Sequence, residues 1–396
     1  MTGALINYSF LYKEHIYIDR TKLRLRHNIE TATRLVLQSP EKTYLNRNEA
    51  VDLFADGEDS VHIKAHYWGV FTMFSLQAFA PHDTLQRAFL KGSDLPAFCR
   101  SAIYLQDRDR PLAVSGKTRI KGFCYLPGAG VKKTFVEDDA FHGDTIIHGQ
   151  TDKSTREMPE IDSARFDYLN KLADGYLPTG MIEMPLDAEL ENSFLTPTAF
   201  INLNSGGYMS RVKIHGNVFL YASSPVVIAS SCDLQDVIVV APSVKIEKGF
   251  KGNLQIIAWD SVIVERNCEL TYPSAVVLLK KKYADNKPTI RIEAGALFEG
   301  LLISWQDQED QKRTLVLVEK DATVKGQVLT NGMASIKGTV IGNVSAYSFY
   351  YETKTTQYDN LLLGATIDYA ALSKHFIGGY FLKADGKTNR VLKWLQ

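Results

Sequence analysis

The sequence predicts a mainly β protein: a right-handed parallel β-helix, or solenoid, with a small N-terminal α+β domain and one helical excursion. Two observations predict this fold class. From residue 101 onward, short β-branched runs recur at nearly even intervals, separated by Gly, Asn, Asp and Ser. Three such runs end in alanines that are almost equally spaced, at Ala222, Ala241 and Ala258. Recurrence at a nearly constant spacing is typical of stacked repeats.

Stacking explains why such short strands are stable. A repeat of two or three short strands cannot bury its apolar face alone, but stacking at about 4.8 Å lets successive repeats share one core. A strict six-residue repeat, typical of left-handed coils, is absent, so we expect a right-handed coil. A β-sandwich is the alternative, since its short strands also recur at regular intervals. Runs that are apolar on both sides, such as Val237–Val240, favour buried parallel strands.

A recurring turn supports the same interpretation. It reads as a β-branched residue, a basic residue and a glycine, in Ile120–Gly122, Ile214–Gly216, Val324–Gly326 and Ile336–Gly338. Glycine provides the backbone freedom that a corner requires, and the β-branched residue is expected to point into the core. The aromatic run Tyr347–Tyr351 is interpreted as a packed strand, with a stacking platform for sugars as the alternative.

The texture of the chain divides it into three parts. Residues 1–98 are predicted to form an α+β head, a helix followed by a β-hairpin that turns near Trp68-Gly69. Residues 99–345 are the solenoid, with a helical insertion near 151–205, and residues 346–396 are a capping segment. We expect a short helix near 369–375 and a strand at 378–382 in that segment.

The N-terminal helix is expected over residues 20–39, capped by Asp19 and followed by Pro40. Its apolar face is predicted from helical spacing to contain Leu25, Ile29, Ala32, Leu35 and Val36. The preceding segment Leu5–Tyr12 is apolar and aromatic, and it has two interpretations. It either continues the helix or forms an edge strand.

Composition excludes several classes of partner. Lys+Arg and Asp+Glu are both 45, so the chain has no global basic field for nucleic acid. No run approaches the roughly 20 apolar residues of a membrane-spanning helix, so membrane attachment is expected only through a segment absent from this chain. The cysteines are too widely spaced for a zinc site or a disulfide framework, and we expect four buried thiols, Cys99, Cys124, Cys232 and Cys268. No cofactor is predicted.

Three residues are candidates for sugar chemistry: Arg119, Asp138 and Asp139. Glycoside hydrolysis uses paired carboxylates as acid and base. Pectin-cleaving β-helix enzymes contain paired Asp and an Arg-Ile-Lys segment, but there the arginine follows the acids, and here it precedes them. We therefore interpret Asp138 and Asp139 as a solvated turn.

A metal site is a second hypothesis. His142 and His148 are six residues apart, with Asp144 between them, and imidazole and carboxylate groups are common metal ligands. A third and fourth ligand are missing from the local sequence. Surface-turn residues are the preferred interpretation.

The Lys-Gly turns and the recurring strands of residues 210–345 resemble the bactofilin type of bacterial polymer-forming β-helix proteins. The resemblance implies scaffolding rather than catalysis. The head resembles a pseudopilin in layout, with an amphipathic helix followed by strands. The expected function is therefore a non-enzymatic bacterial envelope or surface protein with a scaffolding, assembly or adhesion role, whose partners are envelope proteins or further copies of itself. The alternatives are a polysaccharide-binding or polysaccharide-processing β-helix protein and a cytoplasmic location.

Overall fold

The computed structural model describes residues 2–45, 47–55, 57–175, 182–183, 189–203, 207–282, 286–307, 312–383 and 388–395. The chain forms two compact units, which are described separately. The N-terminal unit consists of Met1–Ser93, Ser193–Pro197 and Thr388–Gln396, and the parallel-sheet unit consists of Asp94–Asn192 and Thr198–Lys387. The protein is mainly β, as predicted, with a large parallel sheet and a small helix-plus-antiparallel-sheet unit.

The N-terminal unit begins with one long helix, α1 (Thr2–Gln38), of 37 residues. The segment Leu5–Tyr12 is therefore helical, which resolves the two interpretations left open by the sequence. The predicted start at Asp19 is wrong, because the helix runs through it without a break. Leu25, Ile29, Ala32 and Val36 form the buried face, as predicted, but Leu35 is 36% exposed and lies outside it.

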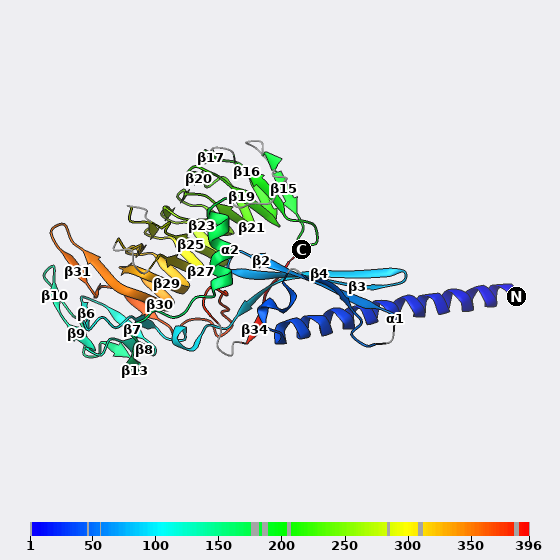
Figure 1. Cartoon of the computed structure of the whole chain (residues 1–396), viewed down its shortest axis with the longest axis horizontal. Helices are drawn as coiled ribbons and strands as arrows, with labels where there is room; N and C mark the ends of the chain where they lie inside the picture. The colour runs from blue at the N-terminus through cyan, green and yellow to red at the C-terminus, as the bar shows by residue number, and fades with distance from the viewer. Residues whose placement is uncertain are drawn as a thin grey trace. The chain divides into compact units, whose positions relative to one another are not determined.

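An antiparallel sheet packs against the second half of α1 (Figure 1). The hairpin of β2 (Ser60–Trp68) and β3 (Phe71–Ala80) is confirmed, with Trp68 opposite Phe71 at its turn. The remaining elements are η1 (Glu41–Tyr44), β1 (Asn48–Val51), β4 (Asp83–Ser93) and β34 (Asn389–Leu395), and the strand order is β1-β2-β3-β4-β34. The chain thus returns to this unit for its last strand.

Two charged side chains are buried between α1 and this sheet. Asp59 is 6% exposed and accepts hydrogen bonds from Arg24 and Asn28 of α1. Lys91 of β4 is fully buried and donates to the carbonyl oxygens of Val36 at 2.9 Å and Ser39 at 3.1 Å. Carbonyl groups at a helix C-terminus lack partners within the helix, so a lysine there satisfies them.

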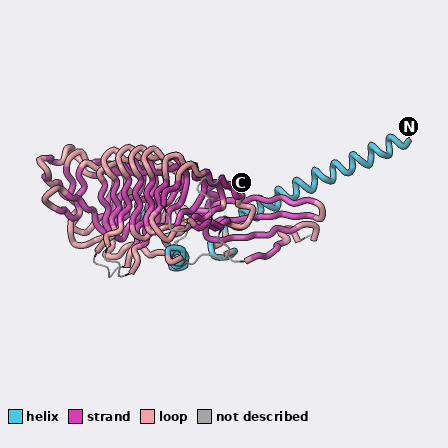
Figure 2. The backbone as a smooth tube through the Cα atoms, turned by 90° about the horizontal axis from the view of Figure 1, so that it is seen from above, coloured by secondary structure: helices cyan, strands magenta, loops and turns pink. Residues whose placement is uncertain are grey.

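The parallel-sheet unit contains a 24-stranded sheet. Its central strands form two series in which each strand pairs in parallel with the strand two elements later (Figure 2). One series is β19 (Val218–Tyr221), β21 (Asp233–Val240), β23 (Lys251–Ala258), β25 (Glu269–Leu279), β27 (Leu297–Trp305) and β29 (Thr323–Ile336). The other is β20 (Val226–Ile228), β22 (Ser243–Ile246), β24 (Ser261–Val264), β26 (Thr289–Ile292) and β28 (Leu315–Val318).

The alanine spacing in the sequence corresponds to this pairing. The N–H of Ala222 donates to the carbonyl oxygen of Val240, and that of Ala241 donates to Ile257. Successive runs therefore lie beside one another in the register that the sequence indicates. Their apolar side chains form one continuous core of fully buried valine, isoleucine and leucine, which includes Val239, Ile256, Val276 and Leu302.

Three of the four predicted corner glycines, Gly216, Gly326 and Gly338, lie where two backbones come close. A Cβ atom on Gly326, whose φ is +141°, would overlap the carbonyl oxygen of Gly300 in the neighbouring strand. Gly300 and Gly342 have the same conformation and the same kind of contact, so Gly300, Gly326 and Gly342 form a column. The β-branched residues of the four predicted turns, Ile120, Ile214, Val324 and Ile336, are all buried.

The sheet continues beyond β29 into strands from both ends of the unit. β30 (Thr339–Glu352) pairs in parallel with β5 (Ile103–Leu105) and β33 (Thr366–Asp368), so Val344 lies opposite Ile103. The following strands are β7 (Arg119–Lys121), β8 (Cys124–Leu126), β12 (Ile147–His148) and β13 (Thr151–Lys153). Beside them lie η2 (Ala97–Cys99), β6 (Leu112–Ser115), β9 (Val131–Lys133), β31 (Gln357–Asp359) and β32 (Leu361–Leu363).

The helical insertion is confirmed as α2 (Ser163–Ala173), capped by Asp162, which accepts from the N–H of Arg165. The insertion contains more strand than predicted, namely β14 (Ile182–Glu183), β15 (Glu189–Asn192) and β16 (Ala199–Asn202), followed by β17 (Gly207–Met209) and β18 (Lys213–Gly216). Its residues 176–181, 184–188 and 204–206 lie outside the described residues. The helix predicted near 369–375 is wrong, because those residues form turns, and residues 378–382 form only isolated bridges.

Candidate functional site

The residues predicted for sugar chemistry lie on the surface of the parallel-sheet unit. Arg119 begins β7 and is exposed. Asp138 lies at the tip of a hairpin between β10 (Phe135–Val136) and β11 (Asp139–Ala140), with a φ of +60°. Glu137 beside it has a φ of +53°, so both central residues of the turn are left-handed, as in a tight hairpin. This conformation agrees with the interpretation of the acidic pair as a turn.

Asp139 has a partner of a different kind. Its Oδ1 lies 3.0 Å from Nε2 of His142, and both side chains are about half exposed. In addition, its carbonyl oxygen accepts a hydrogen bond from Oγ of Ser115. The pair of Asp139 and His142 therefore fastens the hairpin to the segment that follows it, and the two aspartates do not face each other across a cavity.

The three candidate metal ligands are not brought together. His142 binds Asp139, whereas the backbone of Asp144 accepts a hydrogen bond from Nζ of Lys133. His148 lies in β12, opposite Lys121 in the register with β7. Among the described residues, no group of three or more His, Cys, Asp or Glu side chains is placed to hold a metal ion.

The aromatic run Tyr347–Tyr351 lies in β30 and is packed rather than open. Phe349 is fully buried and Tyr350 is 9% exposed. The guanidinium groups of Arg108 and Arg313 lie 4.3 and 3.9 Å from the ring centroid of Tyr347. Cations that close to a ring occupy it through cation–π attraction, so this strand offers no free platform for a sugar.

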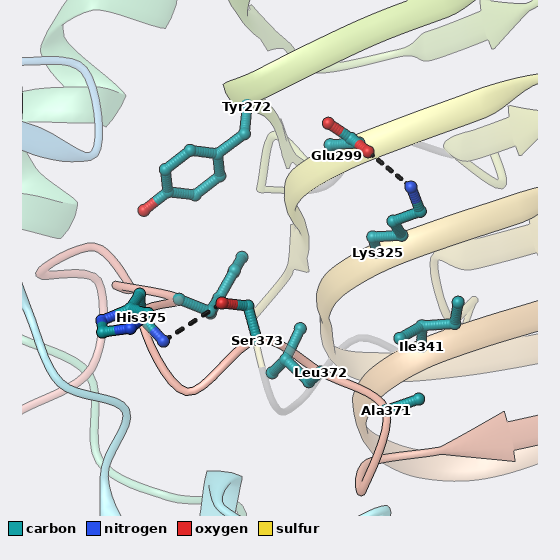
Figure 3. A pocket seen from close by; sticks show the side chains of 9 residues that line it. Tyr272, Glu299, Lys325, Ile341, Ala371, Leu372, Ser373 and His375 are labelled. Carbon is teal, nitrogen blue, oxygen red and sulfur yellow. Dashed lines mark hydrogen bonds and ion pairs between the residues drawn. The ribbon is translucent and has the colours of Figure 1, made fainter.

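A cavity of about 460 Å³ lies beside the column of corner glycines (Figure 3). Tyr272, Glu299, Lys325 and Ile341 line it from the sheet, and the segment 371–376 closes it from the other side. Glu299 and Lys325 point toward each other from neighbouring strands and form an ion pair at 2.8 Å. The lining is otherwise largely apolar, with Leu372 and Phe376 on the opposite wall.

Two polar side chains of this cavity, those of Tyr272 and Lys325, are engaged with the protein, whereas His375 lines it and is exposed. The hydroxyl of Tyr272 donates to the carbonyl oxygen of Ile377 and accepts from its N–H, and burial raises the pKa of Tyr272 far above its usual value. Nζ of Lys325 is bound to Glu299. A catalytic base or nucleophile needs a group that is available to the substrate. These contacts are structural, because they attach the segment 371–376 to the sheet.

The first half of α1 presents an exposed apolar surface in the N-terminal unit. The helix extends beyond the antiparallel sheet (Figure 1). Between residues 5 and 23, nine large apolar side chains are 40% or more exposed: Leu5, Ile6, Tyr8, Phe10, Leu11, Tyr12, Tyr17, Ile18 and Leu23. Tyr8 and Tyr12 stack on each other, with ring centroids 6.4 Å apart. Contiguous exposed apolar surface of this kind marks interaction sites.

The sequence already contained the signal for this surface, because Leu5–Tyr12 is apolar without a polar face. The periodicity alone did not decide between helix and strand. No described helix has an apolar stretch that is long enough to cross a membrane.

Comparison with known proteins identifies no family for this chain. The chain matches no protein-family model and no curated protein. Among solved structures, it is similar to the competence-associated pilin ComZ from Thermus thermophilus at 11% identity, with a TM-score of 0.22. That alignment covers 88% of this chain and 87% of the pilin. A similarity this weak carries no argument about fold or function.

Proposed function

We propose that this protein is a non-enzymatic subunit of a bacterial envelope or surface assembly, in which the exposed first half of α1 packs against the same helix of other copies. The observation that supports this is the row of exposed apolar side chains between Leu5 and Leu23. In the same helix, Leu25, Ile29 and Val36 are buried against the sheet. One helix is therefore anchored at one end and exposed at the other.

The distribution of side chains favours several helical neighbours. Successive residues of a helix are about 100° apart, so Leu5, Ile6 and Leu11 point in three different directions and apolar side chains occur on every side of the segment Leu5–Tyr12. A helix that is apolar on all sides is normally buried on all sides. Both signs of charge occur along this half, with Lys13 beside Glu14 and Asp19 beside Arg20. Mixed signs allow copies of one helix to pack in a staggered register.

The exposed surface is large enough for a specific contact. Its four aromatic side chains, those of Tyr8, Phe10, Tyr12 and Tyr17, are 58–70% exposed, and at about 150–250 Å² for a whole aromatic side chain they offer roughly 350 to 650 Å² per copy, to which five aliphatic side chains add. A standard protein interface buries about 800 Å² on each partner. Contact with the same helix of another copy can therefore bury enough area for a specific interface.

We further infer that the parallel sheet winds as a right-handed solenoid. In the assembly, this solenoid is the rigid body of each subunit, and α1 is the part that binds other copies. The two interleaved series of parallel pairings, β19 to β29 and β20 to β28, support this winding. The charged strands β13 and β15 argue against growth by strand addition, because charges on a terminal strand oppose pairing with another chain. Assembly through α1 is the better account.

The proposal is tested by measuring the oligomeric state of the full chain by sedimentation over a range of concentrations. We expect association in the wild type and loss of it in the variant Leu5→Asp, Tyr8→Asp, Leu11→Asp, because buried carboxylates oppose helix packing.

The matched control is Phe135→Asp, which places the same charge at another exposed apolar residue, 65% exposed and remote in sequence. It should associate as the wild type does. A wild-type chain that stays monomeric at the highest concentration, or association that survives the triple substitution, would overturn the proposal. Fractionation of cells tests the envelope location separately.

A further inference from the structure

A second cavity, of about 580 Å³, lies on the parallel-sheet unit near β5 and β8. Its walls are η2, the strand residues Tyr104 and Tyr125, the segment 153–160 and Lys383. Sites for small molecules span about 300–1,000 Å³, so this cavity is large enough for an organic ligand. Its lining shares no residue with the cavity of Figure 3 or with α1, so the inference drawn from it is independent of the proposed assembly.

One wall of this cavity is aromatic. Phe98 and Tyr104 meet edge to face, with ring centroids 5.7 Å apart, and Tyr104 and Tyr125 follow at 5.9 Å. Tyr125 also contacts Phe123 at 4.9 Å. Phe98 and Tyr125 are only half buried, so part of each ring remains available. A half-exposed, fixed ring is a surface on which a flat, weakly polar ligand face can stack.

The facing segment is held in place by the same aromatic wall. The hydroxyl of Tyr104 donates to the carbonyl oxygen of Glu157 at 3.0 Å and lies 2.8 Å from Oγ1 of Thr155. Tyr104 itself is 5% exposed, so these bonds are sheltered from water. The cavity is therefore preformed, and a ligand need not order the segment when it binds.

Polar groups also line this cavity, and together they are called its rim. They comprise two hydroxyls, two amines and two carboxylates, from Lys153, Ser154, Thr155, Glu157, Glu160 and Lys383. Lys383 and Glu160 form an ion pair at 2.7 Å, which lowers the pKa of Glu160. With two charges of each sign, the rim has no net charge. It matches a ligand rich in hydroxyl groups and without charge, rather than an anion.

Ser154 adds an independent observation. It lines the cavity, is 9% exposed, and its N–H donates to the carbonyl oxygen of Leu126 at 2.8 Å. Its Oγ has no hydrogen-bond partner among the described residues. Buried hydroxyl groups are nearly always paired, so an unpaired one in a cavity wall indicates a partner supplied from outside.

We propose that this cavity binds a neutral oligosaccharide. The apolar face of a pyranose ring stacks on Tyr125 and Phe98, while its hydroxyl groups bind the carboxylate of Glu157 and the hydroxyls of Ser154 and Thr155. A pyranose combines one flat apolar face with a ring of hydroxyls, which is the combination that this wall and rim present. The protein thereby gains an adhesive site on the parallel-sheet unit.

The test is isothermal titration of the full chain with chitohexaose, cellohexaose and maltohexaose, with a sulfated heparin hexasaccharide as the charged comparison. We expect at least one neutral sugar to bind at roughly millimolar concentration or below. Tyr125→Ala should weaken that binding about tenfold, and Ser154→Ala several-fold. Tyr125→Phe keeps the ring and should bind within about twofold of the wild type.

Tyr208→Ala is the control, because Tyr208 is 56% exposed and lies in β17, outside the cavity. It should bind as the wild type does, and thermal unfolding of each variant confirms that the fold is kept. If no neutral sugar binds, if the sulfated sugar binds best, or if Tyr125→Ala binds as tightly as the wild type, the proposal is wrong. None of these outcomes bears on association through α1.

Discussion

Asp59, at the start of the β2–β3 hairpin, holds α1 through Arg24, whose Nε lies 2.8 Å from Oδ2 of the carboxylate. Its other oxygen accepts from Asn28, which is fully buried, at 2.7 Å. The contact lies where the exposed half of the helix ends and the buried half begins. This contact therefore determines how rigidly the exposed half of α1 is held on the antiparallel sheet.

Replacing this carboxylate should destabilise the N-terminal unit. Asp59→Ala removes the acceptor of the buried amide of Asn28 and one of the two carboxylates that bind Arg24, at a cost of about 2 kcal/mol in the free energy of unfolding. Glu58→Ala is the matched control, since Glu58 contacts the same arginine but is exposed. It should cost about 0.5 kcal/mol or less. Urea denaturation of both variants checks the difference, and equal losses would contradict the prediction.

Lys91 predicts a pH dependence. Burial lowers the pKa of Lys91 from 10.5 to about 8. Between these values the unfolded chain keeps the proton and the folded state releases it, so the free energy of unfolding rises with pH. From pH 8 to pH 10 we expect the wild type to gain about 2 kcal/mol relative to Lys91→Met, which has no such group. Denaturation of both proteins across this range measures the gain. A constant difference would show that Lys91 keeps its ordinary pKa.

The column of glycines predicts that alanine destabilises the protein more at Gly326 than at Gly207. Gly326→Ala brings a Cβ atom against the carbonyl oxygen of Gly300, in a backbone with φ of +141°. Gly207 also has a positive φ, +122°, but nothing lies within 4 Å of its Cβ position. We expect losses of about 4 kcal/mol for Gly326→Ala and about 1 to 2 kcal/mol for Gly207→Ala, measured by urea denaturation. Similar losses at both positions would assign the whole cost to the dihedral angle.

The cysteines are buried, as predicted, and they should be unreactive. Burial raises the pKa of Cys124 to about 12, and it raises the pKa of Cys232 and Cys268 as well. Only the thiolate reacts with disulfide reagents, so the native protein at pH 8 should be labelled slowly, whereas the denatured chain should yield four thiols. Thr355→Cys, in an exposed turn, provides the positive control. Rapid labelling of a native cysteine would indicate local opening.

The parallel sheet could be predicted because its strands are buried on both faces. Val237–Val240 and Ala275–Leu279 are continuous apolar runs, and only a parallel arrangement covered on both sides uses such runs well. β15 escaped prediction for the opposite reason. Its sequence Glu-Leu-Glu-Asn is polar because, among the described strands, it pairs only with β18.

Other features depend on contacts that local patterns do not contain. Tyr and Phe have no strong helix preference, so the sequence of Leu5–Tyr12 is compatible with a helix and with a strand. The structure shows that this segment belongs to α1. The lining of the second cavity combines Tyr104, Tyr125 and Lys383, which are far apart in sequence. His142, one of the three candidate metal ligands, forms a pair with Asp139. The spacing of three residues between them does not by itself indicate this pair.

The parallel pairing of Val344 with Ile103 has a consequence for biosynthesis. The two residues are separated by 241 positions in the chain, so at about 5 to 20 residues per second the ribosome needs roughly 12 to 50 seconds to travel from one to the other. During this interval β5 and one of its partners, β8, have been made, but its other partner, β30, has not. The central strands pair with strands that follow them closely in the sequence, so they can fold as they emerge. The first segment of the parallel-sheet unit is therefore among the last to be placed, and a nascent chain that stalls before residue 339 leaves β5 without β30.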